Sequence, residues 1–222
     1  ASVVEVVKSS LWDTKYKKLI WLSFMLAFFN QLSGINFVLY YAPEILERAG
    51  LASQDSLLSS IAIGGVNLIF TMLGMYLIDR MGRRQLMLIG SVGYIISLAM
   101  VAYAFKTEGS SAFLLTFILT FVASHAIGQG AVIWVFLSEI FPNKIRSFGQ
   151  AWGTGVHWVF AAIITLVTPI FLDSTDGIFK DDPSPIFAFF AGFMVLQLLW
   201  TIFIMPETKG RSLEELEKEL IG

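Results

Sequence analysis

The stretch Asn30-Gln31-Leu32-Ser33-Gly34-Ile35-Asn36-Phe37-Val38-Leu39-Tyr40-Tyr41 places three amide side chains inside a long apolar segment. Amides at this depth are costly, because hydrocarbon offers them no hydrogen-bond partner. Such side chains therefore face a cavity or one another. A later apolar segment carries a similar interruption, Gly128-Gln129-Gly130, followed by Trp134. These two stretches predict a membrane protein whose polar residues are turned inward.

The composition supports a membrane protein and excludes several other classes. Of 222 residues, 56% are hydrophobic and 14% are charged, whereas soluble domains carry roughly 25% charged residues. A net charge of −2 predicts no nucleic-acid partner. The chain has no cysteine, and neither histidine has a second ligand at metal-binding spacing. No nucleophile and base, phosphate loop or carboxylate pair stands out, so we expect no enzyme, no metal and no cofactor.

Six apolar segments are long enough to cross a bilayer as helices, which takes about 20 residues each. We expect these spans at 19–41, 57–78, 86–105, 112–137, 149–172 and 185–205. The chain is therefore predicted to be all-α, with a lead-in over 1–18, a transmembrane bundle over 19–205 and a cytoplasmic C-terminal helix over 206–222. Ser212 and Glu215 have the spacing of a capping box at the start of that last helix.

Basic residues predict the orientation of the bundle in the membrane. Twelve of them fall on one side of the predicted spans, namely Lys8, Lys15, Lys17, Lys18, Arg80, Arg83, Arg84, Lys144, Arg146, Lys209, Arg211 and Lys218. The other side has three, Arg48, Lys106 and Lys180. Because cytoplasmic loops are enriched in Lys and Arg, we expect an integral protein of the cell membrane with both termini in the cytoplasm.

A weak inverted symmetry relates the first three spans to the last three. The first and fourth spans are the ones interrupted by glycine and polar residues, and each leads to an acidic-proline element, Pro43-Glu44 or Glu139-Ile140-Phe141-Pro142. Corresponding interrupted helices in two inverted halves are typical of the binding site of a transporter.

Binding residues are expected on the interrupted first span. Asn36 and Tyr40 share one helix face, whereas Gln31 lies about 140° away from Asn36 on an ideal helix. A local distortion at Gly34 would bring the amides together. Amides both donate and accept hydrogen bonds, as a neutral polyhydroxylated solute requires. Amides also link helices to one another, but three within seven residues, Asn30 included, exceed that need.

Four further residues are candidates for the same pathway. Asn67, beside Gly64 and Gly65 in the second span, could equally link helices. Trp134 suits ring stacking better than an interfacial belt, because a glycine lies one turn before it. His157 with Trp158 forms another polar and aromatic pair, whereas His125 is more typical of a structural hydrogen-bonding residue.

Charged residues at the predicted cytoplasmic helix ends form a separate set, Asp79, Arg83, Glu139 and Arg146. They are either simple positive-inside charge or a latch of ion pairs that closes the inner mouth of a pathway.

These motifs resemble the sugar porter family of the major facilitator superfamily. The matching pieces are Gln31-Leu32-Ser33-Gly34-Ile35-Asn36, Tyr40-Tyr41-Ala42-Pro43, Asp79-Arg80-Met81-Gly82-Arg83-Arg84, Trp134 with Ser138-Glu139-Ile140-Phe141-Pro142, Arg146, and Pro206-Glu207-Thr208-Lys209-Gly210-Arg211-Ser212-Leu213-Glu214-Glu215-Leu216. The resemblance implies a fold of twelve helices, of which this chain is similar to the last six.

The resemblance also implies roles for individual residues. Positions that match the family's sugar-binding residues are Gln31, Asn36, Asn30, Asn67, Trp134, His157 and Trp158, and Tyr40 and Tyr41 match its outer-gate tyrosines. Asn30 stands where the family often has glutamine, His157 replaces an amide, and His125 replaces a phenylalanine.

The function implied is transport of a monosaccharide, a hexose or a pentose, by alternating access through the bilayer lipid. An N-terminal six-helix half would be the partner. Two alternatives stay open: a membrane sugar sensor or binding module that does not cycle, and a half-size carrier that works as a homodimer.

Overall fold

The computed structural model describes residues 10–221, and every regular element in that part of the chain is helical. The elements are η1 (Thr14–Tyr16), α1 (Lys17–Leu32), α2 (Ile35–Arg48), α3 (Ser53–Met81), α4 (Arg83–Lys106), α5 (Ser111–His125), η2 (Ala126–Gly130), α6 (Ala131–Glu139), α7 (Arg146–Leu172), α8 (Ser184–Phe203) and α9 (Leu213–Ile221). The first half of the predicted lead-in, with Lys8, lies outside the described residues.

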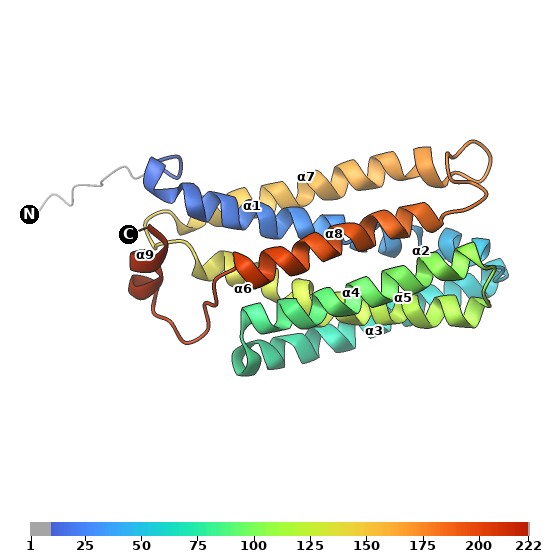
Figure 1. The fold of residues 1–222 in the computed structure, drawn as a ribbon, viewed down its shortest axis with the longest axis horizontal. Helices are drawn as coiled ribbons and strands as arrows, with labels where there is room; N and C mark the ends of the chain where they lie inside the picture. The colour runs from blue at the N-terminus through green and yellow to red at the C-terminus, as the bar shows by residue number, and fades with distance from the viewer. Residues whose placement is uncertain (1–9, 222) are drawn as a thin grey trace, which may run out of the picture.

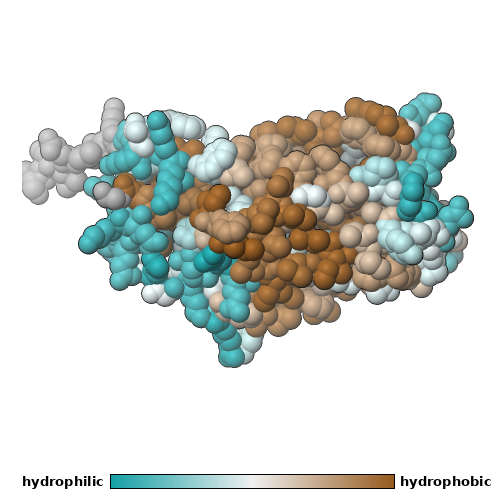
Figure 2. Space-filling model, viewed as in Figure 1, coloured by the Kyte–Doolittle hydropathy of each residue, from teal (hydrophilic) through white to brown (hydrophobic). Residues whose placement is uncertain are grey.

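Six segments are long and apolar enough to cross a membrane, which confirms the predicted spans. They are η1 to α2, α3, α4, α5 to α6, α7 and α8, and they are 20 to 35 residues long. Their side chains form an apolar belt between two hydrophilic caps (Figure 2). The chain is therefore an integral membrane protein built from a bundle of helices that run side by side (Figure 1).

The connections between spans alternate between the two ends of the bundle. The start of α1, the α3–α4 turn, the α6–α7 connection and α9 lie at one end, which we call the α9 end (Figure 1). The α2–α3, α4–α5 and α7–α8 connections lie at the opposite end. Eleven of the fifteen basic residues fall at the α9 end within the described chain, and Arg48, Lys106 and Lys180 fall at the other. The predicted charge asymmetry therefore follows the real ends of the bundle.

The spans are covered to different degrees. α8 packs along α4, and α1 packs along α7. In their most apolar stretches, 72% of the first span is buried, but only 17% of α3 is buried. Exposed apolar side chains therefore follow α3 along its length, among them Ile61, Leu68 and Met72.

The first span breaks between α1 and α2, where the sequence predicts a distortion. Gly34 has φ +82°, a left-handed conformation that glycine adopts without steric cost. The ring of Phe190 from α8 fills the place of its missing side chain, since a Cβ on Gly34 would lie 2.6 Å from Cδ2 of Phe190. The Ser33 hydroxyl donates to the carbonyl of Asn30 at 2.6 Å, which satisfies one backbone group freed by the break.

Two helical details differ from the sequence prediction. The first span does not end at residue 41 but continues through Pro43 to Arg48, with a kink at Tyr41 (φ −109°, ψ 15°). Proline removes one helical hydrogen bond, and a kink two residues earlier accommodates its ring. The fourth span is interrupted by one π-helical turn, η2. There Gly128 meets Gly90 of α4 so closely that a Cβ on either glycine would lie 3.0 Å from the other's Cα.

The predicted capping box is confirmed at the start of α9. The Ser212 hydroxyl accepts from the Glu215 amide at 3.2 Å, and the Glu215 carboxylate accepts from the Ser212 amide at 2.9 Å.

The break at Gly34 gives a stability prediction. Gly34→Ala should lower the free energy of unfolding by at least about 1 kcal/mol, because a left-handed alanine costs roughly 1–2 kcal/mol and its Cβ meets Phe190. Gly155→Ala in α7 is the matched control, since nothing lies within 4 Å of a Cβ there. Unfolding of both variants in detergent would test this, and equal stability of the two would contradict it.

Candidate functional site

A cavity of about 230 Å³ lies beside the break in the first span. Its walls come from α1, α2, α3, the end of α5, the π-helical turn with α6, and α7. The lining residues are Asn30, Gln31, Ile35, Asn36, Leu39, Asn67, Thr71, His125, Gly130, Ile133, Trp134, His157 and Trp158. The structure thus brings together every predicted binding residue except Tyr40. No charged Asp, Glu, Lys or Arg side chain is among these lining residues.

Gln31 is the centre of the hydrogen bonds at this cavity. Its carbonyl oxygen accepts from the Asn36 amide at 2.9 Å, and its amide donates to Asn30 at 3.1 Å. The same amide nitrogen lies 3.1 Å from Nε2 and 3.2 Å from Nδ1 of the His157 ring, so an unprotonated ring nitrogen can accept from it. The break at Gly34 makes this possible, because the continuous helix would hold Gln31 and Asn36 on different faces.

Two tryptophans flank the same histidine. The rings of Trp134 and His157 are 5.1 Å apart between centroids at 60°, and those of His157 and Trp158 are 5.1 Å apart at 83°. The indoles are 45% and 54% exposed, so both keep ring surface open beside the amides. His157 is buried between them, and its hydrogen bond to Gln31 joins α7 to α1.

Asn67 and Thr71 line the cavity from α3, one helical turn apart. Within residues 10–221 the side-chain amide of Asn67 forms no hydrogen bond. Its donors and its acceptor are therefore available to a ligand. Thr71 was not predicted, although its i+4 spacing from Asn67 could have indicated it. His125 also lines the cavity, and its Nδ1 lies 2.5 Å from the hydroxyl of buried Tyr94, as expected of a structural histidine.

The two tyrosines of α2 lie apart from the amides. Tyr40 is 57% exposed and does not line the cavity, although the helical spacing predicts a shared face with Asn36. The Tyr41 hydroxyl donates to the carbonyl of Thr165 at 3.1 Å, which ties α2 to α7. Asn36 and Tyr40 both precede the kink at Tyr41 and keep their i,i+4 spacing, so Tyr40 lies one helical turn beyond Asn36 and past the cavity lining.

A charged cluster occupies the α9 end. The Arg83 guanidinium donates to both carboxylate oxygens of Glu139, with Nε to Oε2 at 3.0 Å and NH2 to Oε1 at 2.6 Å. Only 9% of the Arg83 side chain is exposed, so this fork-like pair is partly shielded from water. Asp79 reaches the same guanidinium at 3.3 Å but is 80% exposed, where an ion pair contributes little.

The remaining partners at the α9 end differ from the predicted set. Arg146 donates from Nε to the carbonyl of Phe141 at 3.3 Å, and none of the ion pairs formed within the described residues includes it. Glu207 instead accepts from the backbone amides of Arg83 and Arg84, both at 3.0 Å, at the N-terminus of α4. A carboxylate at that end of a helix is favoured by the helix dipole. Thr208 donates to Glu139 at 2.6 Å.

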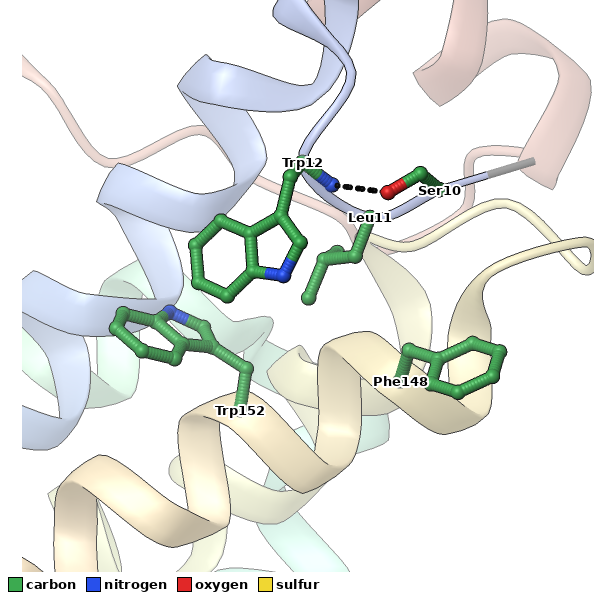
Figure 3. Close-up of a pocket in the computed structure, with 5 residues that line it drawn as sticks. All are labelled: Ser10, Leu11, Trp12, Phe148 and Trp152. Atoms are coloured by element: carbon green, nitrogen blue, oxygen red, sulfur yellow. Dashed lines mark hydrogen bonds between the residues drawn. The ribbon is translucent and has the colours of Figure 1, made fainter.

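A different cavity, of about 390 Å³, lies at the α9 end between Leu11, Trp12, Phe148 and Trp152 (Figure 3). The two indoles meet edge to face with centroids 5.3 Å apart. This site contains none of the predicted binding residues and is typical of an interfacial aromatic cluster. Among residues 10–221 no three His, Asp or Glu side chains are placed to hold a metal ion.

Known proteins resemble this chain over most of its length. The D-xylose-proton symporter of Escherichia coli (strain K12) is 37% identical over 87% of this chain and 39% of its own. The arabinose-proton symporter of Bacillus subtilis (strain 168) is 34% identical over 95% of this chain and 44% of its own. The solved structure of the proton:xylose symporter XylE bound to 6-bromo-6-deoxy-D-glucose superposes with a TM-score of 0.82 at 35% identity, over 90% of this chain and 42% of that one.

The chain therefore spans less than half the length of these relatives. The family model described as "Sugar (and other) transporter" matches residues 3–220. That match, with the shared helical fold, shows that the chain belongs to the sugar (and other) transporter family, whose members are transporters of the major facilitator type and not enzymes.

Proposed function

We propose that this chain is the C-terminal, sugar-binding half of a monosaccharide transporter that works by alternating access. The single observation that carries the proposal is the uncharged cavity in which Gln31, Asn36 and Asn67 lie beside Trp134 and Trp158.

The chemistry of the cavity fits a neutral sugar. Each amide presents a donor and an acceptor, and sugar hydroxyls need both. Tryptophan faces beside them suit the apolar face of a sugar ring. A cavity without charged side chains gives no attraction to an ion. Relatives described as xylose and arabinose symporters support a pentose as the solute, and the XylE structure bound to 6-bromo-6-deoxy-D-glucose supports a hexose.

A second bundle is needed to complete the pathway. The tryptophans of the cavity and the apolar side chains of α3 are exposed in the isolated chain. Amides facing lipid would cost several kcal/mol. We therefore infer that a six-helix N-terminal half, or a second copy of this chain, covers this face. The basic α9 end is assigned to the cytoplasm by the positive-inside rule.

The shielded pair Arg83–Glu139 is proposed as a cytoplasmic latch, with exposed Asp79 at its edge and with Arg146 outside it, since Arg146 forms no ion pair within the described residues. This pair joins the start of α4, at Arg83, to the end of α6, at Glu139, at one membrane face. Ion pairs that are made in only one conformation bias the equilibrium toward that conformation. The predicted gate on the outer side consists of Tyr40 and Tyr41.

The first test is sugar affinity. Gln31→Ala or Asn36→Ala should weaken D-xylose or D-glucose binding several-fold, because each lost hydrogen bond is worth about 1 kcal/mol. Gln197→Leu is the matched control, since Gln197 is a buried amide bonded to Gln129 and Ser91 outside the cavity. Calorimetric titration of folded protein measures the effect. Unchanged affinity in both cavity variants would remove the assignment.

The second test concerns the latch. Glu139→Gln should favour inward-open states, because the buried Arg83 guanidinium loses its carboxylate partner. The chain has no cysteine, so a single cysteine at Thr71 can report thiol labelling from the cytoplasmic side. Asp79→Asn is the control, as it makes the same charge change at an 80% exposed site. Equal labelling of wild type and Glu139→Gln would argue against a latch.

The third test concerns the partner. Co-expression with an N-terminal six-helix half should produce saturable sugar counterflow in liposomes, whereas the monomeric chain should show none, since rocking needs two bundles. Flux from a verified monomer would contradict this. Flux from an assembly of this chain alone would identify the homodimer, and binding without flux in every assembly would identify a sensor.

A further inference from the structure

An apolar groove of about 420 Å³ lies on the bundle away from the sugar cavity. Its sides are α7 and α8, and its floor is the break between α1 and α2. α8 packs along α4, and α7 packs along α1. The groove lies between α7 and α8. Ten of its eleven lining residues are apolar. The exception, Thr168, donates its hydroxyl to the carbonyl of Ile164 at 2.7 Å and needs no further partner.

His157 of the cavity and Ile164 of the groove share the buried face of α7, but the outer edges of the two sites lie on opposite flanks of this helix. Trp158 lines the cavity and Val167 lines the groove. These residues are nine positions apart, which corresponds to about 180° around a helix of 3.6 residues per turn. A partner bundle that covers the cavity on the Trp158 flank therefore leaves the Val167 flank to the bilayer.

The break in the first span is a common wall between the two sites. Gln31 lines the cavity and its neighbour Leu32 lines the groove. The same alternation is repeated beyond the break, where Asn36 lines the cavity and Phe37 lines the groove.

We propose that this groove binds one acyl chain of a bilayer phospholipid. The two helices that form its sides, α7 and α8, cross the apolar belt of the molecule, where lipid is the surrounding solvent (Figure 2). Its volume is that of a ligand pocket, and an empty groove would forfeit dispersion contacts along its whole lining. A flexible, unbranched chain can follow the irregular surface between two helices. Lipid chains have no hydrophobic preference for the groove over other lipid, so packing contacts provide the affinity.

The mouth of the groove suits a phospholipid in particular. Phe179 and Pro185 line it at the α7–α8 connection, which lies at the end of the bundle among hydrophilic residues. Exposed Lys180 follows Phe179 directly. Its ammonium group donates to the carbonyl of Thr175 at 3.2 Å, and exposed Asp181 follows it, so the mouth carries both charges and suits a zwitterionic headgroup.

Occupancy of the groove should influence the sugar cavity. Phe190 lines the groove and also fills the space beside Gly34. A lipid acyl chain in the groove would hold the Phe190 ring against the break that positions Gln31 and Asn36. Coupling between two sites is reciprocal, so lipid should change sugar affinity and sugar should change lipid retention. This consequence rests on the proposed function, but the lipid site itself does not.

The test is photocrosslinking in nanodiscs whose phospholipid carries a diazirine midway along one acyl chain. Adducts mapped by mass spectrometry should concentrate on groove residues such as Val167, Phe171 and Phe189. Val167→Trp fills the groove and should reduce those adducts at least five-fold. Leu166→Trp is the matched control, because Leu166 is adjacent and 76% exposed but does not line the groove.

Phe189→Trp narrows the groove from α8 and serves as the second variant if Val167→Trp does not fold. Adducts spread over Leu166, Phe203 and other lipid-facing residues in proportion to exposure would overturn the proposal. Equal adduct yields in Val167→Trp and Leu166→Trp would also overturn it. Sugar affinity is measured in the same samples. If no sugar binds while the groove adducts are intact, the result would count against the proposed function alone.

Discussion

The structure depends on one constraint, the cost of leaving a polar group without a partner in hydrocarbon. A straight first span would hold Gln31 and Asn36 on separate faces, and at least one amide would meet lipid or an apolar neighbour. The left-handed turn at Gly34 removes this conflict by bringing both amides to one wall. The same turn frees backbone groups, and the Ser33 hydroxyl takes up one of them. The backbone distortion therefore gives the amides their partners and forms the wall of the cavity at the same time.

The charged groups at the α9 end are under the same constraint, because a poorly solvated charge also needs partners. Arg83 is nearly buried, and its guanidinium is satisfied by Glu139, Asp79 and the carbonyl of Ile78. Glu207 supplies the acceptor for the first amides of α4, so the segment after α8 closes a helix from another part of the chain. The cluster thus joins several spans through groups that would be costly if parted. If the cluster is broken, its groups need replacement partners, such as water that enters at the α9 end.

The sequence predicts the parts of this molecule that follow from local chemistry. Six apolar segments predict six spans, and the spacing of Gln31, Gly34 and Asn36 predicts a distortion with converging amides. Features set by tertiary contact were not predictable in this way. The π-helical turn at Gly128 depends on α4 passing within contact distance. The continuation of the first span to Arg48 depends on how the helix accommodates Pro43, which the sequence analysis placed beyond the span.

The wall formed by α1 and α2 has different requirements on its two sides. Under the proposed function, one side must present unpaired hydrogen-bonding groups, because a sugar would exchange for water there. The other must be uniformly apolar, because lipid lies beyond it. Alternating neighbours satisfy both, with Gln31 and Asn36 toward the cavity and Leu32 and Phe37 toward the groove. A continuous helix would rotate these pairs out of alignment within one turn. The break resets the rotation, so its conformation cannot change without altering both surfaces together.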